Sequence, residues 1–295
     1  MKTSIFSFRK TNNAAGIALT KDDLFVNLGG MSGLKKFGNT IYRVWCVFSF
    51  LLPFFILYPF FRLFILRKEW FKYAGALNRF WSWLQLRMYG LSVEVVHKGN
   101  FDPKQQYIFA PNHSSYIDIP LLLSTVPGFL NFVGKSSLTR VPLWGVIFKA
   151  LYISVDRDSA MSRAKTYIFS NRTLDEGRSL VIFPEGKIPD EHVGKELAPF
   201  KDGPFKLAIE RKIPLVPVTM PYNHIFLPDV KGKFIVNHHP LKIVFHEPID
   251  TTNMTLADLE NLKEHVYHLI KTEFVTDINE DRHKHHPESG PLSAA

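Results

Sequence analysis

The chain has 295 residues, 46% of them hydrophobic and 21% charged, so it can bury the core of one large domain or two modest ones. Its formal net charge of +9 favours an anionic partner, and without a zinc-finger, RNP-like or helix-turn-helix pattern we expect no nucleic acid. Cys46 is the only cysteine, which excludes an internal disulfide and a cysteine-rich metal site.

Residues 1–40 are polar and are predicted to be a loosely structured lead-in. An uncharged run rich in phenylalanine follows at residues 44–61, and its length is sufficient to consider a bilayer span. Pro53 and Pro59 would kink or break a helix that had no neighbour to satisfy the freed carbonyl groups. Three interpretations stay open: a spanning helix, a re-entrant or interfacial hairpin, and a buried helix of a soluble domain. We expect no cleaved signal peptide, because the run starts far from Met1.

Basic residues flank the apolar run at both ends, which suits anionic lipid head groups but gives no asymmetry that would set a topology. Tryptophans follow among further basic residues, as expected for an amphipathic surface at head-group level. We therefore predict a helical, membrane-associating region over residues 41–90. The basic flanks are Lys35, Lys36, Arg43, Arg62, Arg67, Lys68 and Lys72, and the tryptophans are Trp70, Trp81 and Trp83.

Residues 91–275 alternate short β-prone segments with helical ones, which predicts an α/β domain. The last helix is expected from residue 256 to about 274, where apolar residues recur at helical spacing after a start signal at Thr255 and Asp258. Residues 276–295 are predicted to be a disordered tail whose histidines are solvated, so we expect no metal site. The expected strands lie at residues 93–96, 107–110, 132–133, 153–155, 180–183, 215–218 and 241–245.

His113 and Asp118 stand where a β-prone segment closed by Pro111 gives way to a helix that opens at residues 119–123. On one continuous helix, residues five apart are rotated by roughly 140°, so the two can meet only with the histidine in a loop and the aspartate at the helix start. In that arrangement the carboxylate accepts from one imidazole nitrogen and leaves the other basic, which prepares a hydroxyl for attack. The alternative is that Asp118 merely caps the helix beside a satisfied turn histidine.

Three further blocks lie within or at the ends of predicted strands, where an open α/β sheet gathers its ligands. They contain Asp156 with Arg157, residues 183–187, and residues 213–218. A surface arginine is the alternative for Arg157, and a helix-start or ion-pair carboxylate is the alternative for Glu185. Basic residues recur at this edge and can hold a phosphate, with arginine as a bidentate fork and lysines as point charges. These residues are Lys135, Arg157, Lys187 and Lys201.

Taken in order, the blocks resemble the motifs of the glycerophospholipid acyltransferases, and specifically of the 1-acylglycerol-3-phosphate acyltransferase family. The resemblance covers about residues 91–250 and implies a mixed sheet flanked by helices, preceded by an N-terminal helical membrane-associating segment. The motifs that carry the resemblance are N-H-x-x-x-x-D at Asn112 to Asp118, Asp156 with Arg157, F-P-E-G at Phe183 to Gly186, F-K-x-G at Phe200 to Gly203, and the Val-Pro pattern around Pro217.

The resemblance implies that His113 takes the proton of an acceptor hydroxyl as that oxygen attacks the thioester of acyl-carrier protein or coenzyme A, while Asp118 stabilises the imidazolium. The acceptor would be lysophosphatidic acid, acylated at its free sn-2 hydroxyl to phosphatidic acid, without a covalent acyl-enzyme, cofactor or metal. The implied location is a membrane, with its lipid as a partner and the active site facing the cytoplasm. The residues assigned to acceptor binding are Arg157, Glu185, Gly186, Lys187, Lys201 and Lys135.

The third block departs from the family's usual Gly-Thr-Arg, because Gly186 is followed by Lys187 and Ile188. Lys187 lacks the arginine fork, so another lyso-lipid, such as a lyso-aminolipid, stays open as the acceptor. An insertion at residues 189–199 adjoins this block and is a candidate for reshaping the acceptor pocket. A non-catalytic membrane-surface binding protein is the second alternative. A serine hydrolase lacks its G-x-S-x-G motif, and a phosphate-binding loop at Lys135 fails on glycine spacing.

Overall fold

The computed structural model describes residues 33–102, 104–156, 159–189, 197–230 and 233–285. Residues 1–32 of the predicted lead-in, residues 286–295 of the predicted tail and Arg157 lie outside the described residues.

In the part of the chain that the structure describes, seven strands form one mixed sheet in the order β1-β7-β6-β2-β5-β3-β4. Every neighbouring pair is parallel except β6 and β7, which are antiparallel. All seven predicted strands are confirmed, and their ends differ from the prediction by no more than two residues. The strands are β1 (Val93–His97), β2 (Ile108–Pro111), β3 (Leu130–Lys135), β4 (Ile153–Val155), β5 (Ser179–Val181), β6 (Leu215–Thr219) and β7 (Leu241–Phe245).

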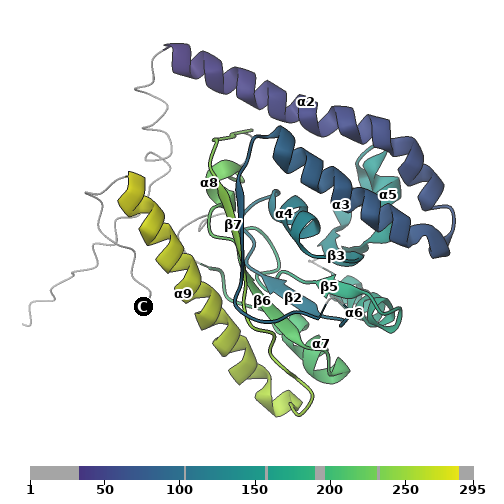
Figure 1. Cartoon of the computed structure of the whole chain (residues 1–295). Coiled ribbons are helices and arrows are strands. Elements are labelled where there is room, and N and C mark those ends of the chain that lie inside the picture. The colour runs from purple at the N-terminus through teal and green to yellow at the C-terminus, as the bar shows by residue number, and fades with distance from the viewer. Residues whose placement is uncertain (1–32, 103, 157–158, 190–196, 231–232, 286–295) are drawn as a thin grey trace, which may run out of the picture.

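Helices cover both faces of the sheet (Figure 1). One face packs against α3 (Phe71–Met88), α4 (Asp118–Thr125) and α5 (Trp144–Leu151) in a core that includes Phe109, Val181 and Val216. The other face packs against α6 (Ala160–Asp175), α7 (Gly203–Arg211) and α9 (Leu259–His285) in a core that includes Ile108, Leu180 and Leu215. The described residues also form short helices at η1 (Lys68–Trp70), η2 (Ser136–Arg140), α8 (Asn223–Phe226) and η3 (Leu256–Asp258).

The apolar run is part of one long helix, α2 (Gly33–Phe64), which contains both Pro53 and Pro59. The prolines therefore do not break the helix, and residues 33–40 are helical where a lead-in was predicted. Figure 1 shows α3 running back beside α2. The ring of Trp81 on α3 lies 5.3 Å from that of Phe54 and 6.3 Å from that of Phe61, and this packing on both sides of Pro59 offsets hydrogen bonds lost at proline.

By length and composition, the stretch Phe37–Phe64 of α2 is able to cross a membrane, and only 28% of its most apolar window is buried. This exposure argues against a core helix of a soluble domain, since such a helix would be mostly buried. The exposed large apolar side chains of α2 are Phe37, Ile41, Val44, Trp45, Val47, Phe48, Phe50, Leu51, Leu52, Phe55, Ile56, Phe60 and Leu63.

The C-terminal helix α9 begins as predicted, because Thr255 and Asp258 form a reciprocal capping box at η3. It ends at His285, so the prediction of a disordered tail is wrong for residues 276–285. Ile278 packs with Tyr222, and Asp277 pairs with Lys242 at 2.6 Å. These partners are remote in sequence, which is why composition alone did not reveal the extra turns.

The connections of the sheet bring several loops to one edge. Strand β2 has β6 on one side and β5 on the other, and all three run in the same direction. The chain leaves β2 for α4 on one face and leaves β5 for α7 on the other. Residues that follow these strands therefore meet at the carboxyl edge, where open α/β sheets bind ligands.

Candidate active site

His113 lies in the turn that joins β2 to α4, and Asp118 is the first residue of α4. The distance from His113 Nδ1 to Asp118 Oδ2 is 2.7 Å, and Asp118 is 0% exposed. Pro120 occupies the first turn of α4, where a missing N–H is tolerated. The predicted contact between a loop histidine and a helix-start aspartate is therefore confirmed.

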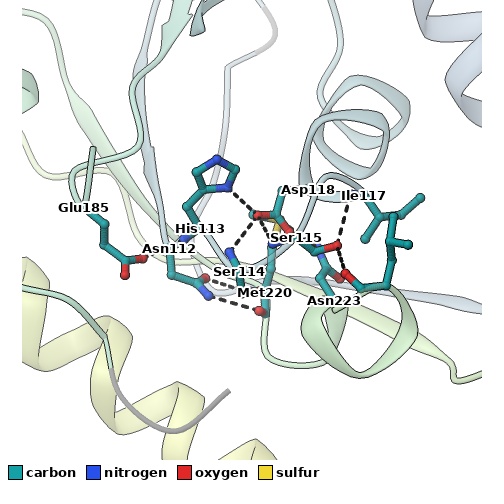
Figure 2. Close-up of polar contacts among 10 residues, drawn as sticks. Asn112, His113, Ser114, Ser115, Ile117, Asp118, Glu185, Met220 and Asn223 are labelled. Atoms are coloured by element: carbon teal, nitrogen blue, oxygen red, sulfur yellow. Dashed lines mark hydrogen bonds and ion pairs between the residues drawn. The ribbon is translucent and has the colours of Figure 1, made fainter. Parts of the chain in front are cut away.

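Both oxygens of Asp118 accept further hydrogen bonds (Figure 2). Oδ2 accepts from the main-chain N–H groups of Ser114, at 2.9 Å, and Ser115, at 3.1 Å. Oδ1 accepts from Nδ2 of Asn223 at 2.7 Å. These donors precede α4 or come from α8, and the N-cap position of α4 is Ile117, whose side chain makes no cap. The interpretation of Asp118 as a simple helix cap is therefore wrong.

The His113 ring is fixed on two sides. It stacks on Phe183, with ring centroids 3.9 Å apart and an interplanar angle of 21°. Its Nδ1–H donates to Asp118, which leaves the lone pair on Nε2. Figure 2 shows the second ring nitrogen pointing away from Asp118, and no residue that the structure describes forms a hydrogen bond with it. With His113 9% exposed, this arrangement suits proton abstraction from a bound hydroxyl.

Glu185 follows β5 and is only 4% exposed. Its Oε1 accepts from the main-chain N–H of His113 at 2.7 Å, and its Oε2 accepts from that of Ala198 at 2.9 Å. Burial raises the pKa of this carboxyl to about 7, while the two main-chain donors lower it and the charge of Asp118 adds to the rise. We interpret Glu185 as a residue that holds the main chain of His113, rather than as a direct ligand of the acceptor.

The raised pKa of Glu185 makes the stability of the folded protein depend on pH. The folded state keeps a proton that the unfolded chain loses near pH 4.5, so this contribution is complete below pH 4.5 and is lost as pH rises through about 7. The change corresponds to roughly 3 kcal/mol. Because glutamine does not titrate, the stability of the parent relative to Glu185→Gln is expected to fall between pH 4.5 and 8. Thermal unfolding in detergent across this range measures it, and parallel profiles would contradict the assignment.

Gly186 and Lys201 come together beside Glu185. The φ of Gly186 is +78°, in the left-handed region that favours glycine. A Cβ at this position would lie 2.7 Å from Nζ of Lys201, so the lysine side chain passes directly over the glycine. The main-chain N–H of Lys201 donates to the carbonyl of Pro184 at 2.9 Å. The exposed side chain of Lys201 therefore lies against the third block, although Lys201 follows Lys187 by fourteen positions in the sequence.

Two other predicted cations, Lys135 and Lys187, lie along the same edge of the sheet. Lys135 is the last residue of β3, which pairs with β5, and its register partner on β4 is Val155. Lys187 directly follows Gly186 and is exposed. Arg157 lies two positions after the end of β4 but outside the described residues. Within the described ranges, no group of three or more His, Cys, Asp or Glu side chains could hold a metal ion.

Two asparagines join the site to the segment after β6. Oδ1 of Asn112 accepts from the N–H of Met220 at 2.7 Å, and its Nδ2 donates to the carbonyl of the same residue at 3.1 Å. Asn223 donates to Asp118, as described above. Asn223 was not predicted as a site residue, because its contact with Asp118 spans 105 positions and no local motif contains it. The one sequence feature that could have indicated a role for Asn223 is its position shortly after a predicted strand.

Comparisons with known proteins point to one family. Residues 92–221 match a family model described as Acyltransferase. The human 1-acyl-sn-glycerol-3-phosphate acyltransferase alpha is 29% identical over 194 residues, which cover 63% of this chain and 65% of the human protein. The 1-acyl-sn-glycerol-3-phosphate acyltransferase of Saccharomyces cerevisiae is 32% identical over 187 residues, which cover 61% of this chain and 58% of the yeast protein. The matches therefore span less than two thirds of these relatives.

A solved structure shares the fold. The crystal structure of PlsC, the 1-acyl-sn-glycerophosphate (LPA) acyltransferase from Thermotoga maritima, superposes with a TM-score of 0.66 at 21% sequence identity. The superposition covers 81% of this chain and 95% of that protein. It agrees with the mixed sheet flanked by helices that the sequence predicted.

Proposed function

We propose that this protein, whose residues 92–221 match the Acyltransferase family model, transfers a fatty acyl group from an acyl thioester to lysophosphatidic acid. The acceptor oxygen is the free sn-2 hydroxyl, and the product is phosphatidic acid. The observation that carries this proposal is the 2.7 Å contact of His113 Nδ1 with the buried Asp118, which leaves Nε2 as the base. The named relatives support the choice of substrate.

In the proposed reaction, His113 Nε2 takes the proton of the acceptor hydroxyl while the hydroxyl oxygen attacks the thioester carbonyl carbon. The imidazolium that forms is stabilised by the Asp118 carboxylate through Nδ1. The new C–O bond forms, the C–S bond breaks, and the departing thiolate takes from the imidazolium the proton that came from the acceptor hydroxyl. The thioester is carried by acyl-carrier protein or coenzyme A, and no cofactor or metal takes part.

The acceptor's phosphate is assigned to the lysines at the carboxyl edge, with Lys201 over Gly186 as the central contact. A charge-assisted hydrogen bond contributes about 1.5–3 kcal/mol. We therefore expect Lys201→Met to raise the KM for lysophosphatidate by about 10- to 100-fold and to leave the KM of a phosphate-free acceptor within about 3-fold. Steady-state kinetics on both acceptors measure the difference. Lys206→Met is the matched control, since Lys206 lies on α7 and faces Glu210.

A panel of lyso-acceptors tests the substrate itself. Purified protein is given an acyl-CoA or an acyl-carrier-protein donor with lysophosphatidate, monoacylglycerol or a lyso-aminolipid. Phosphatidate is expected to form fastest. Faster consumption of the lyso-aminolipid would favour a lyso-aminolipid as the natural acceptor, the alternative suggested by Lys187 in place of an arginine in the third block. Failure of every acceptor would favour a non-catalytic membrane-surface binding protein.

The same proposal places the protein at a membrane, with α2 as the attachment and the site on the cytoplasmic side. Support comes from the exposed apolar side chains of α2 and from the basic residues at both of its ends. The proposed partners are therefore membrane lipid, the lyso-phospholipid and the thioester donor. Co-sedimentation with anionic vesicles tests this placement, and protein that stays in the supernatant would contradict it.

A further inference from the structure

Asn223 donates a hydrogen bond to one oxygen of the Asp118 carboxylate. Of the residues that the structure describes, Asn223 alone forms a hydrogen bond with Oδ1 of Asp118, at 2.7 Å, whereas Oδ2 has three donors. An ionised carboxylate only accepts, so the amide must turn its N–H toward Asp118. Asn223 is 0% exposed, which places this contact away from solvent.

Packing alone does not account for an amide at position 223. The Oδ1 atom of Asn223 is buried and has no hydrogen-bond partner among the described residues. A buried acceptor without a partner costs about 1–3 kcal/mol, and an apolar side chain of similar size would avoid that cost. The contact that distinguishes asparagine from such a side chain is its bond to Asp118.

The segment that carries Asn223, residues 220–227, forms hydrogen bonds at both of its ends with the turn at residues 112–118. At the first residue of this segment, Asn112 makes two hydrogen bonds with the main chain of Met220. At its last residue, the hydroxyl of Ser115 donates to the carbonyl of Leu227 at 2.7 Å. Figure 2 shows Asn112, Met220 and Asn223 gathered beside Asp118. Asn223 is therefore held in register with Asp118 by contacts that do not depend on its own side chain.

We propose that Asn223 is a positioning residue that fixes the Asp118 carboxylate, so that Oδ2 stays on Nδ1 of His113. The inference rests on the proposed function, because it describes a role in the same proton transfer. Asn223 acts through Asp118 and does not contact the acceptor. Without its N–H, the carboxylate can rotate about its last side-chain bond and misalign the imidazole. In metal sites, residues that orient a ligand in this way contribute about 10- to 100-fold to affinity or activity, and we expect an effect of the same order here.

Two substitutions separate positioning from packing. Asn223→Ala removes the donor and leaves a cavity, whereas Asn223→Asp keeps the shape but sets a second carboxyl group against Asp118. Two such groups at hydrogen-bond distance cannot both ionise without strong repulsion. If Asn223 only filled space, the aspartate variant would be the more active of the two. Positioning predicts the reverse at alkaline pH, and recovery of the aspartate variant at acid pH, where a protonated carboxyl can donate to Asp118.

The experiment measures kcat and KM for acyl transfer between pH 5.5 and 8.5 in the parent, both variants and Asn237→Ala. Asn237 is the matched control, because it donates to the carbonyl of Ile225 on α8 without touching Asp118. At pH 8 we expect kcat to fall about 10-fold for Asn223→Ala and about 100-fold for Asn223→Asp, with KM within about 3-fold. Equal or greater activity of Asn223→Asp than of Asn223→Ala at pH 8 would overturn the proposal.

A second readout needs no acyl transfer. The rate at which diethyl pyrocarbonate modifies His113 is followed by mass spectrometry at pH 7 in the same proteins. Slower modification in Asn223→Asp than in the parent is expected, with Asn237→Ala unchanged, and equal rates would overturn the positioning role. A parent without transfer activity would defeat the proposed function but leave this readout intact. Should Asn223→Asp fail to fold, parent-like kcat and modification in Asn223→Ala would overturn the inference.

Discussion

His113→Ala is expected to lower the rate of acyl transfer about 10³-fold or more. The Nε2 atom is the basic atom of the His113–Asp118 pair, so its removal leaves the hydroxyl to be deprotonated by water. Acceptor binding is assigned to lysines elsewhere on the edge, so the KM is expected to change by less than about 3-fold. Transfer of a radiolabelled acyl group to lysophosphatidate measures both quantities.

The matched control for this substitution is His97→Ala. Like His113, His97 stacks on a phenylalanine, and the ring centroids of His97 and Phe245 are 5.1 Å apart. His97 lies on β1, however, away from β2 and β5. Its replacement is expected to leave the rate within about 2-fold of the parent. A His113→Ala protein that kept the parent rate would instead favour the non-catalytic alternative.

Asp118→Asn is expected to lower the rate about 10²- to 10⁴-fold. The carboxylate accepts from His113, Ser114 and Ser115 on one oxygen and from Asn223 on the other. An amide must turn its NH₂ group toward one of these donor sets, so it either loses the imidazole contact or opposes Asn223. Either orientation also removes the negative charge that stabilises the imidazolium. The rate of transfer and the thermal midpoint are measured together.

Asp102→Asn controls for the general effect of removing an aspartate. Asp102 accepts from the main-chain N–H of Lys104 at 2.8 Å, but it is exposed and precedes β2. We expect the activity of the Asp102→Asn variant to stay within about 2-fold of the parent. An Asp118→Asn protein with the parent rate and a lowered thermal midpoint would show that Asp118 serves folding alone.

The sheet could be predicted from the sequence because its strands are short apolar runs bounded by turn residues. Strands β2 and β6 are buried along their whole length, which gives the continuous apolar pattern of an internal strand. Helix lengths were harder to predict. α2 continues through Pro53 and Pro59 by packing on Trp81, and α9 continues past residue 274 through the pair of Asp277 with Lys242. Both extensions depend on partners that are distant in the chain.

The contact within the site could be predicted where it was local. His113 and Asp118 are five positions apart, so the geometry of a strand-to-helix turn was sufficient to place them together. Glu185 was predicted to bind the acceptor, but both of its oxygens accept from main-chain N–H groups. Asn223 was missed because its bond to Asp118 arises from the order of β6 and β2 in the sheet. Sequence spacing carries no information about such a pairing.

A double substitution tests most directly whether His113 and Asp118 act as one unit. Single-turnover rates of acyl transfer to lysophosphatidate are compared for the parent, His113→Ala, Asp118→Asn and the double variant. If Asp118 works through His113, removing it from a protein that already lacks the imidazole has little further effect. We predict that the double variant transfers acyl groups within about 3-fold of His113→Ala alone. Losses that multiply in the double variant would contradict the account.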